Sequence, residues 1–391
     1  MADLRIGIIG IGNMGSAHFS CISSGKINAL RLTAVCDLRQ ERLDFCRENA
    51  PGVACYTDWK VLITDPDVDA VIIAVPHPMH ADMAMAALNA GKHVLTEKPV
   101  DIRVSKAKAL NECAAGSGKV FGIMFNQRTN PLFQKAREII RSGQLGEMRR
   151  TVWIITNWYR TQAYYDSGTW RATWSGEGGG VLLNQCPHQL DIWQWICGMP
   201  TEVSAFCDVA KYHNIEVEDD VTIITRYANG ATGTFITSTG EYPGTNRLEI
   251  TGTLGKIVLE EGKLKWWKLD RDVQEHCIHA GQNDPKPAIA YSEFTPDGPT
   301  PGHPGILQNF ANAIVYGEPL IAPGTDGIHE LTISNAAYLS AWNGGAVVKL
   351  PLDTDAFDAK LDALAENSRL RQNAVSDKVS TDYSARWQVQ W

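Results

Sequence analysis

A glycine-rich turn near the start of the chain constrains its fold most strongly. The apolar run 4–9 leads directly into Gly10-Ile-Gly12-Asn13-Met14-Gly15, and a helical pattern follows. The first glycine permits a tight turn, the second lets the backbone approach a pyrophosphate, and the third lets helix and strand pack closely. A phosphate would lie at the positive end of that helix. The segment therefore predicts a strand–turn–helix unit that binds a dinucleotide.

Strand and helix signals alternate through the first 125 residues. Further short apolar runs lie at 31–36, 70–75, 93–96 and 120–125. The helical stretches between them end at glycines, such as Gly91 and Gly116, which are common helix stops. Alternation of this kind predicts a parallel sheet with helices on both faces. We therefore expect a doubly wound Rossmann domain over residues 1–126.

The pattern changes after Glu147. A strand is expected at 148–157 and a helix at 180–197, and strand signals then follow one another without helices. These strands are expected at 203–209, 220–227, 231–238, 247–251 and 256–259. Asn229-Gly230 is a hairpin signal, so the second sheet should be mainly antiparallel. Helical patterns return at 306–316 and 328–342, which predicts an α+β domain over 127–355 and a polar C-terminal arm over 356–391.

Length and composition limit the possible classes of protein. A chain of 391 residues is too long for one compact core, which agrees with two domains. The net charge of -8 argues against nucleic acid or an anionic membrane as a partner. The nine cysteines form no CxxC pair, and scattered histidines lack ligand spacing, so no disulfide framework and no metal site is expected. Without a signal-peptide pattern or an apolar run of membrane-spanning length, we predict a cytoplasmic protein.

The end of the second expected strand indicates which dinucleotide binds. Asp37 stands there, and its carboxylate can accept hydrogen bonds from the ribose diol of NAD. Arg39 and Arg42 favour NADP instead, because an arginine can bind the 2′-phosphate of that cofactor. We predict NAD, with NADP as the alternative. At the end of the third strand, His80 is expected to cap the next helix or to touch the cofactor, and a structural role stays open.

Two short segments about ninety residues apart carry the candidate reaction chemistry. Glu97-Lys98-Pro99 ends an apolar strand, and Pro99 restricts the backbone before it and is a candidate cis proline. The other segment runs from Gly178-Gly179-Gly180 to His188 and Asp191. A lysine and a histidine brought together over a nucleotide site can position and deprotonate a substrate hydroxyl. If the helix spans 180–197, then Asn184, His188 and Asp191 share one face.

Together these motifs resemble the glucose–fructose oxidoreductase/inositol dehydrogenase/MocA (Gfo/Idh/MocA) family over about residues 4–350. The resemblance implies a Rossmann domain followed by an open, mainly antiparallel sheet domain with helices on one face, often used for oligomer contacts. It implies that Lys98 orients the substrate hydroxyl and that His188 removes its proton. Hydride would pass to C4 of the nicotinamide. A homodimer or homotetramer is therefore expected.

The sequence departs from the family at Asn184. Many members place an aspartate four residues before the histidine, and a neutral amide cannot raise the basicity of His188 by charge. Asn184 is therefore a candidate to hold a sugar hydroxyl, and Asp191 is a candidate to supply the missing carboxylate. The segment around His188, with His329-Glu330 and Ala341-Trp342, is similar to members acting on glycosides at the C3 hydroxyl.

An aromatic stretch at 153–174 precedes this segment. Aromatic faces stack on pyranose rings, and the arginines between them can bind hydroxyls, although packing in a core or a subunit interface is the alternative. By the family likeness, Trp170-Arg171 closes over the nicotinamide. The candidate substrate-binding residues are Asn184, Asp191, Arg128, Trp158, Arg160 and Tyr164. The candidate cofactor-binding residues are Gly10, Gly12, Asn13, Met14, Asp37, Arg39, Val75, Pro76, His80, Glu97, Lys98, Asn126, Trp170 and Arg171.

These observations predict an NAD-dependent sugar dehydrogenase with Lys98 and His188 as its catalytic residues. The expected reaction oxidises a ring secondary hydroxyl of a glucosyl unit, at C3. Three alternatives stay open: an inositol 2-dehydrogenase, a redox-assisted NAD-dependent glycosidase and a non-catalytic NAD-binding regulator. The intact Lys98 and His188 argue against the last of these.

Overall fold

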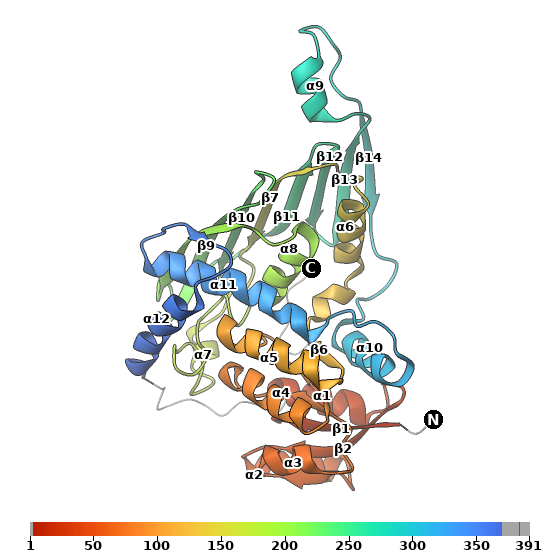
Figure 1. Cartoon of the computed structure of the whole chain (residues 1–391), viewed down its shortest axis with the longest axis vertical. Coiled ribbons are helices and arrows are strands. Elements are labelled where there is room, and N and C mark those ends of the chain that lie inside the picture. The colour runs from red at the N-terminus through yellow and green to blue at the C-terminus, as the bar shows by residue number, and fades with distance from the viewer. Residues whose placement is uncertain (1–2, 370–382, 384–391) are drawn as a thin grey trace.

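The computed structural model describes residues 3–369 and Tyr383, and its first layer is a six-stranded parallel sheet (Figure 1). The strand order is β3-β2-β1-β4-β5-β6, which confirms the expected Rossmann arrangement. The strands are β1 (Leu4–Ile9), β2 (Leu30–Cys36), β3 (Ala54–Tyr56), β4 (Ala70–Ile73), β5 (His93–Thr96) and β6 (Phe121–Ile123). The three-residue β3 gives too short an apolar signal and was not anticipated.

Helices pack on both faces of this sheet. They are α1 (Asn13–Ser23), α2 (Gln40–Asn49), α3 (Trp59–Thr64), α4 (His80–Asn89) and α5 (Val104–Ser117). Short 3-10 turns follow two strands at their carboxyl ends, η1 (His77–Met79) after β4 and η2 (Asn126–Thr129) after β6. These carboxyl ends share one edge of the sheet, which is where α/β folds bind ligands.

The second layer is a nine-stranded sheet that is antiparallel except where β7 and β10 pair in parallel. Its order is β14-β13-β12-β11-β7-β10-β9-β8-β15. Its strands are β7 (Met148–Ile155), β8 (Glu202–Val209), β9 (Glu218–Arg226), β10 (Thr232–Ser238), β11 (Asn246–Gly252), β12 (Gly255–Glu260), β13 (Lys263–Leu269), β14 (Ile289–Phe294) and β15 (Val348–Lys349). The strand signals found in the sequence end at residue 259 and therefore missed β14. This edge strand exposes most of its residues and so lacks an apolar alternation.

One face of the second sheet is covered by helices. The covering helices are α6 (Pro131–Arg141), α8 (Pro187–Cys197) and α11 (Gly327–Trp342), with the short α7 (Gln162–Tyr165) and α9 (Val273–His279) outside them. Trp193 of α8 fixes this packing, since its indole N–H donates to Thr151 Oγ1 at 3.0 Å and its ring lies 5.5 Å from that of Phe235.

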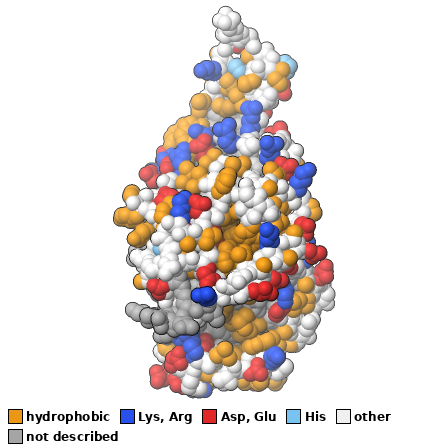
Figure 2. Space-filling model, turned by 90° about the vertical axis from the view of Figure 1, so that its left-hand side faces the viewer, with side chains coloured by type: hydrophobic (Ala, Val, Ile, Leu, Met, Phe, Trp, Pro, Cys, Tyr) orange, Lys and Arg blue, Asp and Glu red, His pale blue; other side chains and the backbone are white. Residues whose placement is uncertain are grey.

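The opposite face of this sheet remains open. Register places Phe206, Thr222, Ile236 and Ile154 side by side across four neighbouring strands. Phe206 is 62% exposed, and Ile224 on the same face is 48% exposed. Figure 2 shows hydrophobic side chains gathered over the middle of one side of the molecule. An open apolar sheet face of this kind is suited to contacts between subunits.

The C-terminal part of the chain returns to the first layer. Helix α10 (Gly302–Tyr316) meets the α1–β2 loop, where Gln308 accepts a hydrogen bond from the Asn28 N–H at 2.8 Å. Helix α12 (Thr354–Glu366) buries Phe357 and Leu361, and its Asp358 pairs with Arg103. The start of the expected arm is therefore a packed helix. Residues 370–382 and 384–391 of that arm lie outside the described part.

Three expected absences can be compared with the structure. All nine cysteines lie within the described residues, and they are free thiols. Among those residues, no helix is long and apolar enough to cross a membrane. The same part of the chain holds no group of three or more metal-ligating side chains.

Candidate active site

The glycine turn after β1 has the shape that a dinucleotide requires. Gly10 has a φ of +91°, and a side chain there would overlap the Ala74 carbonyl oxygen. A Cβ at Gly15 would overlap the Gly10 carbonyl oxygen, so the start of α1 lies directly against the turn. A Cβ at Gly12, by contrast, would meet nothing within 4 Å. Gly12 therefore lines open space at the N-terminus of α1, where a pyrophosphate fits.

Asp37 stands at the end of β2 beside this turn. Its carboxylate accepts hydrogen bonds from the backbone N–H groups of Ile11 at 2.8 Å and Arg39 at 2.9 Å. The Arg39 guanidinium also lies 3.4 Å from it. The carboxylate is thus held at the position expected for a ribose diol, and the nearby arginine is engaged by it. Both features suit NAD better than a 2′-phosphorylated cofactor.

The segment after β4 forms the next wall. Val75 lies against the glycine turn, and Pro76 leads into η1. His80 is fully buried, and its ring nitrogens lie 2.6 and 2.7 Å from the carbonyl oxygens of Pro99 and Val75. It therefore ties the end of β4 to the loop after Lys98. This is the structural role that the sequence left open, and the contact of His80 with the cofactor stays a prediction.

Glu97 and Lys98 follow β5 at the same sheet edge. Lys98 is only 8% exposed, and its ammonium donates to the backbone carbonyl of Asn184 at 2.6 Å. Glu97 Oε1 lies 2.7 Å from His18 Nε2. The Lys98–Pro99 peptide bond is cis, as the sequence suggested. Burial lowers the pKa of Lys98, and the charges of nearby carboxylates oppose this shift.

His188 lies in the first turn of α8. This helix begins at Pro187, not near residue 180, because proline suits the first helical position and the preceding residues form turns instead. The expected shared helical face with Asn184 was therefore wrong. His188 is 2% exposed, and burial followed by the charge of Lys98 holds its pKa well below the ordinary value. Lys98 and His188 are thus close enough to influence each other, and the imidazole is neutral at neutral pH.

Asp191 binds Arg128. The carboxylate accepts from Arg128 Nη2 at 2.6 Å and Nε at 2.9 Å, and both side chains are 1% exposed. Arg128 Nη1 also donates to Asp326 at 2.6 Å. The expectation that Asp191 supplies a carboxylate to His188 was wrong, since its oxygens neutralise a buried guanidinium. Arg128 is held by these two carboxylates, and its contact with a substrate stays a prediction.

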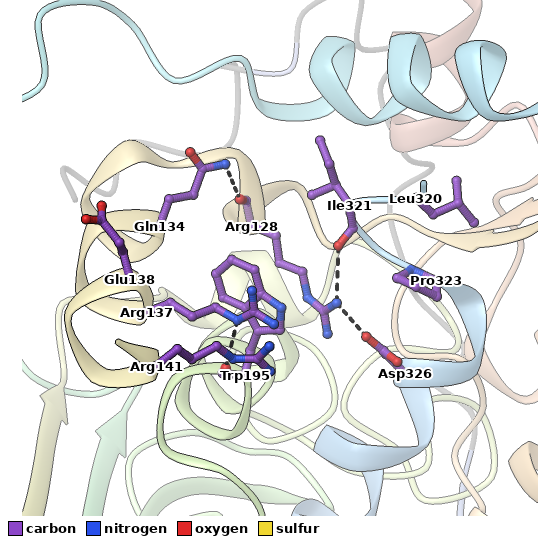
Figure 3. A pocket seen from close by; sticks show the side chains of 10 residues that line it. All are labelled: Arg128, Gln134, Arg137, Glu138, Arg141, Trp195, Leu320, Ile321, Pro323 and Asp326. Carbon is purple, nitrogen blue, oxygen red and sulfur yellow. Dashed lines mark hydrogen bonds and ion pairs between the residues drawn. The ribbon is translucent and has the colours of Figure 1, made fainter. Parts of the chain in front are cut away.

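Figure 3 shows where Arg128 lies. It forms a wall of a cavity of about 500 Å³ between α6, α8 and η3 (Gly324–Asp326), together with Arg137 and Trp195. Trp195 is seven residues beyond His188 and so about 10 Å further along α8. Arg137 stacks on Trp195, with its guanidinium carbon 4.1 Å from the ring centre. The Trp195 wall of this cavity therefore lies along α8 from His188, while its Arg128 wall is bonded to Asp191.

Glu177 is a buried carboxylate that binds Asn184. The Asn184 side-chain amide donates to Glu177 Oε1, and the Ala172 N–H donates to Glu177 Oε2 at 2.6 Å. Burial raises the pKa of Glu177, while the charges of Arg171 and Lys98 act against that shift. Asn184 thus links a buried carboxylate to the lysine through its own side chain and carbonyl. The signal was present, because Glu177 directly precedes the glycine triplet.

Glu330 of α11 is a second buried acid near the lysine. It is fully buried, and burial followed by Asp191 raises its pKa well above the ordinary value. The charge of Lys98 acts to lower this pKa, so Glu330 and Lys98 are close enough for their charges to interact. The sequence drew attention to Glu330 only through its family likeness.

The aromatic stretch splits between packing and the site. Trp158 is 0% exposed, so its face is not available to a sugar, and Arg160 stacks over it at 5.5 Å. Trp170 meets the His77 ring edge-on at 5.6 Å and so closes over the end of β4. The closure of Trp170 and Arg171 over the nicotinamide stays a prediction. Tyr164 joins this group, since its hydroxyl accepts from Arg171 at 3.1 Å.

Two family models match the sequence of this chain. The first, for an oxidoreductase family with an NAD-binding Rossmann fold, matches residues 4–125. The second, for the GFO/IDH/MocA C-terminal domain, matches residues 133–258. The two segments together cover more than half of the chain. The chain belongs to the Gfo/Idh/MocA family. It is an NAD-binding oxidoreductase, and its resemblance to the family in sequence is confirmed.

Several Gfo/Idh/MocA relatives act on cyclic polyols. The chain is 25% identical to myo-inositol 2-dehydrogenase of Thermotoga maritima over 86% of its own length and 96% of that protein's. It is 28% identical to levoglucosan dehydrogenase of Pseudarthrobacter phenanthrenivorans over 66% and 74%. The crystal structure of the WlbA dehydrogenase from Bordetella pertussis, in complex with NADH and UDP-GlcNAcA, is similar with a TM-score of 0.74. That likeness covers 90% of this chain and 100% of WlbA at 25% identity.

Proposed function

We propose that this protein oxidises a ring secondary hydroxyl of a sugar or glycoside, at C3 of a glucosyl unit, with NAD as the acceptor. One observation carries the proposal. The buried Lys98 and the buried, neutral His188 interact at the carboxyl edge of the Rossmann sheet. They lie beside the glycine turn, in which Gly10 and Gly15 are packed against backbone and Gly12 faces open space. Such a pair can hold and deprotonate a hydroxyl group.

His188 is the general base. Its lowered pKa keeps the imidazole unprotonated at neutral pH, so it can accept the hydroxyl proton. Lys98 is the group that orients the hydroxyl oxygen. An ammonium has three donors, and among the described residues only the Asn184 carbonyl accepts from it. The remaining N–H groups can bind the substrate oxygen and stabilise negative charge as the proton leaves.

The cofactor would be held by residues on both sides of the glycine turn. Gly12, Asn13 and Met14 offer the pyrophosphate the N-terminus of α1, and Asp37 offers the ribose a carboxylate. Glu97, Asn126 and Trp170 would border the nicotinamide end. When bound, NAD supplies a hydride acceptor next to the substrate carbon.

The preference for a glycoside rests on Asn184 and Glu177. Their hydrogen bond places an amide and a buried carboxylate beside Lys98, and both can accept hydrogen bonds from ring hydroxyls next to the reacting one. The levoglucosan dehydrogenase relative supports an anhydrosugar or glycoside. The myo-inositol 2-dehydrogenase relative supports a cyclitol, which is the second candidate.

A substrate panel tests the proposal. Purified protein is incubated with NAD and a set of glucosides, anhydrosugars and inositols while the absorbance of reduced nicotinamide is followed, and products are assigned by NMR. We expect a 3-keto glycoside as the product. An inosose, the ketone formed from an inositol, would favour the cyclitol dehydrogenase. Release of an aglycone without net NAD reduction would favour the glycosidase. Tight NAD binding without turnover of any polyol would contradict the proposal.

A further inference from the structure

Tyr383 is a described residue of the C-terminal segment that lies beside the reaction site. Its hydroxyl is 2.8 Å from Nδ1 of His18, which is fully buried on α1. Its ring stacks on that of His303 on α10, with centroids 4.4 Å apart and an interplanar angle of 1°. His303 in turn lies 3.4 Å from the side-chain nitrogen of Asn126. The phenol thus fills the space between α1 and α10 on the side where β5 and β6 end.

His18 connects this phenol to the reaction site. Its Nε2 lies 2.7 Å from Glu97 Oε1, and Glu97 Oε2 accepts the backbone N–H of Lys98 at 3.3 Å. A hydrogen-bonded row therefore runs from Tyr383 through His18 and Glu97 to the residue that would hold the substrate oxygen. Its members are distant in sequence, and only Glu97 and Lys98 were singled out from the sequence as site residues.

Protonation fixes the direction of this row. Burial acts to raise the pKa of Glu97, but the hydrogen bond from His18 and the positive charge around the carboxylate, including that of Lys98, lower the pKa to about 2. Glu97 is therefore a carboxylate that can only accept, so His18 Nε2 donates to it. In a neutral imidazole Nδ1 is then an acceptor. Burial raises the pKa of Tyr383, so its hydroxyl keeps the proton that Nδ1 needs.

We propose that Tyr383 is a positioning residue for the reaction site, whose hydroxyl holds His18 in the tautomer that donates to Glu97 and thereby fixes Glu97 beside Lys98. This role deepens the proposed function, on which its kinetic consequence rests. In this proposal Tyr383 acts on the site through its hydrogen bond to His18.

The test uses Tyr383→Phe in the full chain. Phenylalanine keeps the ring that stacks on His303 and removes only the hydroxyl, which leaves a buried imidazole nitrogen without its donor. For the substrate identified by the panel, we expect kcat to fall about tenfold, the size expected for one buried hydrogen bond. The KM for the sugar should change less than twofold. Tyr316→Phe is the matched control, because Tyr316 is 56% exposed at the end of α10, and it should behave as the wild type.

A second measurement does not depend on turnover. Nitrogen-15 NMR of histidine-labelled protein reports which ring nitrogen of His18 carries the proton, and His18→Gln identifies its signals. We expect Nε2 to be protonated in the wild type, and Tyr383→Phe to shift the Nδ1 signal. Unchanged His18 signals in Tyr383→Phe, or a wild-type His18 protonated at Nδ1, would overturn the inference. If no sugar is oxidised, the proposed function fails, and this spectrum still decides the role of Tyr383.

Discussion

Asp191 gives the most discriminating single substitution, because the structure moves it from the reaction chemistry to the core. Asp191→Asn keeps the size of the side chain and removes the charge that neutralises Arg128. Removing one partner of a buried ion pair costs about 3–5 kcal/mol. Arg128 keeps a second carboxylate, Asp326, and asparagine keeps one acceptor oxygen. We therefore expect a loss near the low end of that range, about 3 kcal/mol.

Urea unfolding followed by tryptophan fluorescence measures this loss as a lower transition midpoint. Asp326→Asn is the matched control, because Asp326 contacts the same guanidinium but is 31% exposed, and its replacement should cost clearly less. The folded Asp191→Asn protein should keep its turnover within about threefold, because both Asp191 oxygens are engaged by Arg128. An unchanged midpoint together with a loss of turnover of a hundredfold or more would refute this reasoning and return Asp191 to the catalytic machinery.

Three further predictions concern protonation, the cofactor turn and assembly. Because the pKa of His188 is lowered, its base form persists as pH falls, and the acid limb of the kcat profile should lie well below pH 6.5. Because the pKa of Lys98 is also lowered, the alkaline limb of that profile should lie below pH 10.5. A limb at either ordinary value would count against these assignments. Gly12→Ala should fold normally and lose NAD affinity at least tenfold, measured by fluorescence titration. Gly15→Ala should fold poorly, because its Cβ would overlap the Gly10 carbonyl oxygen. If Gly12→Ala binds NAD as tightly as the wild type, the turn is not the cofactor site. Ile224→Lys on the open sheet face should convert the expected dimer or tetramer to a smaller species in light scattering, and an unchanged mass would place the contacts elsewhere.

The sequence predicted the parts of this structure that local patterns determine. The glycine turn, the alternation in the first 125 residues and the hairpin at Asn229-Gly230 each depend on neighbouring residues, and the structure has them. The start of α8 was misplaced because the glycine-led stretch before Pro187 looks helical until tertiary contacts order it as turns. The apolar residues before Pro187 continue into the helix that begins there, so the pattern shows no break at its first residue.

The errors within the site have a different cause, since they concern partners distant in the sequence. Asp191 is 63 residues from Arg128, and no local pattern reveals that pairing. Glu177 is only seven residues from Asn184 and stands beside the glycine triplet, but their hydrogen bond depends on the turns between them, which the sequence analysis took as helix. Tyr383 joins His18 across almost the whole chain. Helical spacing can predict a shared face, and it cannot predict which neighbour neutralises a buried charge.

The most direct test of the central claim is a single-turnover measurement with His188→Ala. Wild-type protein and variant, both saturated with NAD, are mixed with the sugar identified by the panel, and formation of reduced nicotinamide is followed. The account predicts a rapid phase in the wild type and its loss by at least a thousandfold in His188→Ala, with NAD affinity unchanged within about twofold. A rapid phase that survives in the variant, or a large loss of NAD affinity, would contradict the role of His188 as the base.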